Sequence, residues 1–259
     1  MIGPHRLRER LLAGRPVVGP IINFDSPWLV DICGAAGFDF VLIDAEHGPM
    51  TPSDVESMVR AAEGAGISSV VRVPANVPHE ILRYLDIGAV GVKVPKVETE
   101  AEALLVRNSV RYPPLGQRGL AAITRAAGYG LTISAKEYVE IANRELLAFA
   151  MVESAKGVEE IDRIAAVPGI DVISIGPGDL SVSMGFGGDR SAAPVREAIA
   201  HVIARTKAAG KWVSLPAVDR AGAQACVEQG ANLVFINVSP FFFGVAKQLV
   251  DTFGLANPE

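Results

Sequence analysis

Cysteine is scarce in this sequence of 259 residues, which contains only Cys33 and Cys226. Two cysteines so far apart do not form a disulfide framework, and no cysteine or histidine spacing typical of a zinc site is present. A chain of this length buries enough surface to fold without cross-links. We therefore expect a reduced, cytoplasmic protein.

The sequence also lacks the charge and hydropathy patterns of nucleic-acid-binding and membrane proteins. Its 24 basic residues are balanced by 29 acidic ones, and no basic stripe or aromatic RNA-binding motif occurs, so we expect no nucleic-acid partner. Residues 1–14 are charged and do not resemble a signal peptide. No uncharged apolar run approaches the ~18 residues of a membrane span, so we expect no membrane partner.

Alternating strand and helix patterns fill the sequence. Short runs rich in Val and Ile predict strands at 17–23, 40–44, 68–73, 89–94, 147–153, 170–176, 212–217 and 232–237. Helical patterns cover 26–36, 51–64, 77–86, 98–108, 135–144, 155–165, 192–209, 219–229 and 241–254. Wholly apolar strands are typical of parallel sheets covered on both faces. Eight such units predict an α/β fold, a closed (β/α)8 TIM barrel.

An open doubly wound sheet is the rival fold. It usually carries a glycine fingerprint after its first strand, but residues 23–26 read Asn-Phe-Asp-Ser. No linker divides the chain, so we predict one domain over residues 1–259. The irregular stretch 111–130 is long for a compact domain, which is typical of a lid or binding loop.

Two carboxylates, Glu153 and Asp179, follow the predicted fifth and sixth strands. The carboxyl ends of barrel strands converge on one face, where the two side chains would repel each other. A divalent cation with room for water and substrate oxygens, such as Mg²⁺ or Mn²⁺, would relieve this repulsion. The structural alternative is that Asp179 caps a helix and Glu153 pairs with a basic residue.

A histidine and an arginine follow the second and third strands. His47 comes three residues after Asp44, a carboxylate that would fix its tautomer, and histidine is the commonest general base near neutral pH. Arg72 lies in a valine-rich strand and needs an anion, which is either a substrate oxyanion or Asp44 or Glu46. A histidine satisfied by a loop carbonyl is the structural alternative for His47.

The turn at 176–181, GPGDLS, has glycines that let backbone approach a ligand closely. Amides that open the following helical turn would bind a carboxylate.

Six motifs occur in order along most of the chain: LIDAEHGP (42–49), VVRVP (70–74), VKVPKVETEAEA (92–103), RYPPLGQRG (111–119), MVES (151–154) and SIGPGDLS (174–181). Together they closely resemble the metal-dependent (class II) pyruvate aldolases of the 4-hydroxy-2-oxoheptanedioate aldolase family, whose relatives act on 2-keto-3-deoxy sugar acids. The chain departs from many relatives at Met151, where they carry Gln, and at Lys96, where they are often apolar.

The resemblance implies a barrel of the phosphoenolpyruvate/pyruvate type. It also implies a homo-hexamer or trimer in which the last helices are exchanged between neighbours. The residues that match the family's site are as follows: Glu153 and Asp179 match its metal ligands, His47 its base, Asp44 the partner of that base, Asp86 an additional acidic neighbour, Arg72 the group that stabilises the enolate oxygen, and Gly178 and Asp179 the amide donors to the pyruvate carboxylate.

The expected activity is reversible formation or cleavage of 4-hydroxy-2-oxo acids from pyruvate or hydroxypyruvate and an aldehyde. It would use a divalent metal ion, Mg²⁺ or Mn²⁺ with Co²⁺ as a further candidate. Three other barrel functions stay open: a citrate/malyl-type CoA-ester lyase, a phosphosugar enzyme and a keto-acid binder without activity. A covalent class I route would use Lys93 or Lys96, but it would leave the carboxylate pair unexplained.

Overall fold

Eight parallel strands close into a barrel in the order β1 to β8, with β8 paired to β1, in a computed structural model that describes residues 6–254. The strands are β1 (Val17–Ile22), β2 (Phe40–Asp44), β3 (Ser68–Arg72), β4 (Gly91–Val94), β5 (Leu147–Val152), β6 (Val172–Ile175), β7 (Trp212–Ala217) and β8 (Leu233–Asn237). The predicted (β/α)8 barrel is confirmed.

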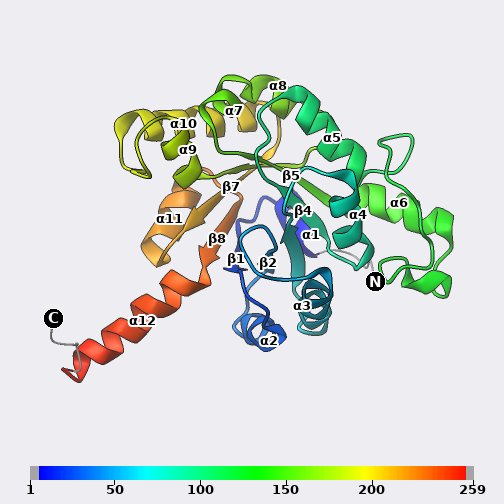
Figure 1. Cartoon of the computed structure of the whole chain (residues 1–259), viewed down its shortest axis with the longest axis horizontal. Helices are drawn as coiled ribbons and strands as arrows, with labels where there is room; N and C mark the ends of the chain where they lie inside the picture. The colour runs from blue at the N-terminus through cyan, green and yellow to red at the C-terminus, as the bar shows by residue number, and fades with distance from the viewer. Residues whose placement is uncertain (1–5, 255–259) are drawn as a thin grey trace.

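Helices surround the barrel and connect its strands (Figure 1). They are α1 (Arg6–Leu12), α2 (Pro27–Ala35), α3 (Pro52–Gly64), α4 (Pro78–Asp86), α5 (Glu100–Val110), the 3-10 turn η1 (Gly128–Gly130), α6 (Ala135–Glu145), α7 (Ala155–Glu159), α8 (Ile161–Ala166), α9 (Pro177–Ser183), α10 (Ala193–Ala208), α11 (Arg220–Glu228) and α12 (Val238–Thr252). None of the helices in residues 6–254 is long and apolar enough to cross a membrane.

The strands bury both faces, as the continuous apolar runs predict. Alternate residues point into the barrel or toward the helices, because side chains of a strand alternate with period two. The interior cluster contains Phe40, Phe149 and Phe235, and α1 adds Leu7 and Leu11 to it. The sequence-based prediction missed α1, whose seven residues are too few for a clear helical period.

Local sequence signals fix several helix starts. Thr51 and Asp54 form a reciprocal capping box at the start of α3, followed by Pro52 at the first helical position. The side chains of Ser134 and Asp219 cap α6 and α11 by accepting one hydrogen bond each, from the backbone amides of Glu137 and Gly222. These caps orient helices that pack against the strands.

Two predicted helices differ from the structure by a break or by more than two residues at one end. The helix expected at 155–165 is divided into α7 and α8 at Glu160. The helix expected at 241–254 begins earlier, at Val238, directly after β8. The stretch 111–130 has no α-helix and contains only η1, as expected for a long loop.

Helix α12 projects away from the barrel (Figure 1). None of its residues is buried. Its large apolar side chains are exposed, including Phe242, Val245 and Leu249 at 71%, 56% and 62%. Within this chain, therefore, the helix leaves an apolar surface uncovered.

Candidate active site

Strand β2 ends at Asp44, and the chain turns at once through Glu46 and His47. The Asp44 carboxylate organises this turn by accepting hydrogen bonds from the backbone amides of Glu46 (3.2 Å) and His47 (3.4 Å). Asp44 is 2% exposed, whereas the side chain of His47 is 60% exposed. The turn thus buries the carboxylate and leaves the imidazole accessible at the carboxyl ends of the strands.

Arg72 is the last residue of β3 and binds the Asp44 carboxylate with two parallel hydrogen bonds. Its Nε donates to Oδ1 at 2.7 Å and its Nη2 to Oδ2 at 2.5 Å, the bidentate geometry in which arginine binds carboxylates. Burial by itself would raise the pKa of Asp44, but the hydrogen bonds from Arg72 and its charge outweigh burial and lower it. Asp44 is therefore an anion that fixes the guanidinium.

Glu46 links the arginine to the histidine. Its Oε2 lies 3.4 Å from Arg72 Nε and 3.8 Å from His47 Nε2. Asp44 contacts the backbone of His47 rather than its ring, so the carboxylate beside the imidazole is that of Glu46. The sequence had offered Glu46 only as an alternative partner of Arg72, because spacing along a turn does not reveal which carboxylate faces a ring.

Glu153 follows β5 and is 7% exposed. Burial raises its pKa, and repulsion from Asp179 and Glu46 raises it further, although the backbone amide of Lys96 donates to its Oε1 at 2.8 Å. Glu153 and Asp179 thus lie close enough for their charges to repel. Lys96 adopts a positive φ of 54°, a conformation uncommon for a non-glycine residue, as its amide reaches the carboxylate.

The turn after β6 makes room for the Glu153 carboxylate. A Cβ on Gly176 would lie 2.7 Å from Glu153 Oε2 and 2.6 Å from Met151 Cε. Gly178 and Asp179 belong to the first turn of α9, where backbone N–H groups lack intrahelical partners. The missing side chain therefore lets a buried carboxylate lie beside a turn with donor amides.

The donor set fits a divalent cation. Two carboxylate ligands that repel each other, with coordination positions left for water and substrate, suit Mg²⁺ or Mn²⁺ better than a closed protein cage. No cluster of three or more acidic, histidine or cysteine ligands is found among residues 6–254. A metal site at this place would therefore be an open one with two carboxylate ligands, Glu153 and Asp179.

Asp86 lies apart from the candidate active site. It is the last residue of α4, just before β4 begins, and so belongs to the end of the barrel opposite the strand carboxyl ends. Arg118 Nη2 donates to its carboxylate at 2.7 Å. Burial raises the pKa of Asp86 and Arg118 opposes this. Within one chain, Asp86 and His47 therefore lie at opposite ends of the barrel. The catalytic role of Asp86 stays a prediction.

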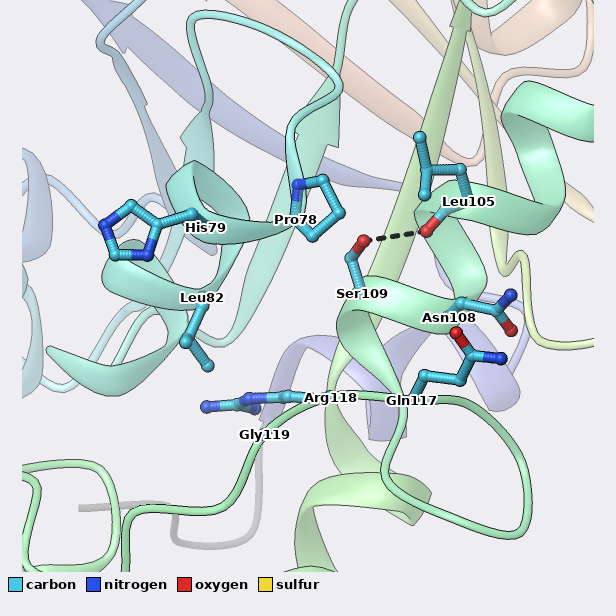
Figure 2. A pocket seen from close by; sticks show the side chains of 9 residues that line it. All are labelled: Pro78, His79, Leu82, Leu105, Asn108, Ser109, Gln117, Arg118 and Gly119. Atoms are coloured by element: carbon cyan, nitrogen blue, oxygen red, sulfur yellow. Dashed lines mark hydrogen bonds between the residues drawn. The ribbon is translucent and has the colours of Figure 1, made fainter.

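A cavity of about 280 Å³ lies between α4, α5 and the 111–130 loop (Figure 2). Its lining residues are Pro78, His79, Leu82, Leu105, Asn108, Ser109, Gln117, Arg118 and Gly119. This set includes none of the residues at the strand carboxyl ends. Volume alone does not locate chemistry, so we place the active site at the converging carboxylates and Arg72.

Known proteins resemble this chain over nearly its whole length. A family model described as HpcH/HpaI aldolase/citrate lyase matches residues 21–241. The 5-keto-4-deoxy-D-glucarate aldolase of Salmonella paratyphi A (strain ATCC 9150 / SARB42) is 36% identical over 253 residues, which are 97% of this chain and 98% of that protein.

Solved structures agree with the sequence matches. An HpcH/HpaI aldolase/citrate lyase family protein from Burkholderia cenocepacia J2315 superimposes with a TM-score of 0.91 at 34% identity, covering 96% of this chain and 99% of that one. An HpcH/HpaI aldolase from Desulfitobacterium hafniense DCB-2 gives 0.89 at 31%, with 97% of both chains covered. The chain therefore belongs to the HpcH/HpaI aldolase/citrate lyase family as a class II aldolase, a carbon–carbon lyase that depends on a divalent metal ion.

Proposed function

We propose that the enzyme forms and cleaves 4-hydroxy-2-oxo acids, with pyruvate or hydroxypyruvate as the nucleophile and an aldehyde as its partner. One observation carries the proposal: the buried Glu153 is repelled by Asp179 and Glu46, and it lies near enough to the fixed Arg72 for their charges to interact. Such a site has negative ligands for a cation and a positive donor for an oxyanion. Cleavage beside a keto group needs both, because charge develops on the keto oxygen.

Glu153 and Asp179 would hold the metal ion, for which we propose Mg²⁺ or Mn²⁺, with Co²⁺ as a further candidate. When bound, the ion supplies Lewis-acid chemistry at the keto oxygen. The Lys96 amide and the space at Gly176 keep the Glu153 carboxylate in position for this ligand role. The raised pKa of Glu153 fits a carboxylate that a cation would stabilise.

Arg72 would hold the keto oxygen as it gains charge. Its contact with Asp44 fixes the guanidinium before substrate binds, so little reorganisation is needed during reaction. The backbone amides of Gly178 and Asp179 would receive the substrate carboxylate at the first turn of α9. Together these groups would orient a 2-keto acid.

His47 would move the proton between the substrate hydroxyl, or C3, and solvent. It is exposed and has Glu46 near its Nε2 and the Asp44 turn at its backbone. Both contacts hold the exposed imidazole at the carboxyl ends of the strands, where solvent reaches it. Asp44 is thus a support for the loop of the base as well as the partner of Arg72.

The assembly we propose is a homo-hexamer or trimer with α12 exchanged between neighbours, in the cytoplasm. The uncovered apolar residues of α12 support such an exchange. A contribution of Asp86 to His47 would also require a second copy, because Asp86 lies at the opposite end of its own barrel. The substrates are small molecules, and the aldehyde of the D-glucarate-derived relatives is the first to test.

Exchange of pyruvate methyl protons in deuterated water tests the central step without knowledge of the aldehyde. We expect exchange with added Mg²⁺ or Mn²⁺ and its loss after chelation. A barrel that only binds keto acids would exchange nothing in either condition. Exchange that persists in metal-stripped protein would contradict the metal role. A panel of aldehydes with pyruvate and hydroxypyruvate would then assign the substrates.

A further inference from the structure

Lys93 points into the barrel, beside the residues of the proposed active site. It lies on β4 in register with Arg72 on β3 and with Phe149 on β5, and Phe149 belongs to the interior cluster. Lys93 is 3% exposed, and its Nζ is 4.7 Å from the ring centre of Phe235 on β8. The side chain therefore extends across the interior rather than out through the mouth.

The Lys93 ammonium has no hydrogen bond or ion pair to any residue in the described part of the chain. Burial lowers its pKa to about 7, with repulsion from Arg72 adding to the effect and attraction from Glu153, Asp44 and Glu46 opposing it. All four of these charged residues belong to the active-site end. TIM-barrel interiors are usually filled by branched apolar side chains, and a buried charge without an anionic partner is costly.

Two hydroxyl groups share this interior. Ser174 on β6 and Ser214 on β7 are register partners, and Ser214 also pairs with Leu233 of the interior cluster. Both serines are completely buried, and neither Oγ has a hydrogen-bond partner within residues 6–254. The layers of the barrel below the mouth thus contain three polar groups where an apolar core would be more stable.

We propose that Lys93 supplies a second positive charge to the keto-acid site from below, with Ser174 and Ser214 as the polar floor. The inference rests on the proposed aldolase function and deepens it. Arg72 is largely neutralised by Asp44 and Glu46, whereas no carboxylate contacts Lys93. Its field therefore acts on the enolate that forms above it, in a medium where water screens little.

This role has opposite consequences for the two ligands of the site. A positive charge repels a metal cation and attracts an enolate. Removal of the charge should therefore strengthen metal binding and weaken the binding of an enolate analogue. A lysine that only filled space would change both affinities in the same direction when replaced.

The experiment uses full-length Lys93→Met and Lys93→Gln proteins. Mn²⁺ binding is titrated by calorimetry, followed by titration of oxalate, a planar analogue of the pyruvate enolate, at saturating Mn²⁺. We expect tighter Mn²⁺ binding and about tenfold weaker oxalate binding, the size expected for one charge several ångströms away. If the Lys93→Met and Lys93→Gln proteins show the same changes in affinity, the effect is due to the lost charge rather than to packing. Lys156→Met, which removes an exposed charge on α7, should change neither affinity.

Parallel changes in the two affinities, or none, would overturn the inference. A borohydride-trapped pyruvate adduct on Lys93 would also overturn it, because the lysine would then act covalently. If the wild-type protein binds Mn²⁺ and oxalate and the Lys93 variants bind them equally well, only the role of Lys93 is rejected. Wild-type protein that binds neither ligand rejects the metal-dependent function, and this inference with it.

Discussion

Glu153 carries a charge that the folded chain destabilises in the absence of a cation, because the residue is buried and repelled by Asp179 and Glu46. Glu153→Gln removes that charge but retains the shape and the acceptor for the Lys96 amide. We expect it to reduce metal-dependent pyruvate proton exchange by at least ~100-fold and to leave the melting temperature equal or higher. Exchange rates and circular dichroism measure both. Glu159→Gln on α7 is the matched control, and exchange unchanged by Glu153→Gln would contradict the ligand role.

The role proposed for Arg72 depends on the geometry of its guanidinium as much as on its charge. Lysine at this position keeps the charge but cannot form two parallel bonds to Asp44. We expect Arg72→Lys to lower kcat/KM by about 100-fold or more. Steady-state kinetics of cleavage would measure this, and a variant within threefold of wild type would show that a point charge suffices.

Lys93 should make stability depend on pH in a definite direction. Its pKa falls from 10.5 to about 7 on folding, so the unfolded chain binds this proton more tightly. The penalty to the folded state is therefore fully present below about pH 7 and disappears as the pH rises through about 10.5. Lys93→Met should raise the free energy of unfolding by at most ~4 kcal/mol near pH 7, and by less toward pH 10. Urea unfolding at several pH values tests this; a difference independent of pH would contradict it.

At the scale of elements, the alternation of strand and helix patterns was sufficient to predict the barrel, and its strand ends were enough to gather Asp44, Arg72 and Glu153. Periodicity could not predict what depends on contacts distant in sequence. The seven-residue α1 is recognisable as an element only through its contacts with the barrel interior. For the same reason, periodicity did not reveal that Asp86 is separated from His47. A residue at the end of a helix can be assigned to one end of the barrel only after the connections between helices and strands are known.

A substitution in the β6–α9 turn can test how precisely the backbone positions the Glu153 carboxylate. Alanine at Gly176 would place a Cβ against Glu153 Oε2 and Met151 Cε. We expect Gly176→Ala to displace the carboxylate and weaken Mn²⁺ binding by about tenfold or more, a loss of ~1.4 kcal/mol. Gly64→Ala is the matched control, because a Cβ there meets no atom within 4 Å and alanine favours the helical end of α3. Equal Mn²⁺ affinity in both variants would show that the carboxylate relaxes freely.

At the scale of the whole molecule, α12 requires an explanation outside one chain. Phe242, Val245, Leu249 and Phe253 recur at helical spacing and are exposed at 71%, 56%, 62% and 69%. A stripe of this kind is covered in a stable protein, and the family resemblance makes another subunit the expected cover. Soluble monomers seldom leave such a contiguous surface open.

Charged substitutions on this stripe should therefore dissociate the proposed assembly. We expect Phe242→Glu combined with Leu249→Glu to reduce the molar mass measured by light scattering, because two carboxylates would have to be buried in the interface. The barrel of each subunit should keep its secondary structure, since α12 contributes no buried residue to its own chain. Lys247→Glu, a more polar position on the same helix, serves as the control. If the doubly substituted protein kept the wild-type mass, α12 would not hold the subunits together. If activity fell with the mass, the active site would need residues from a neighbouring subunit, as a role for Asp86 at His47 requires.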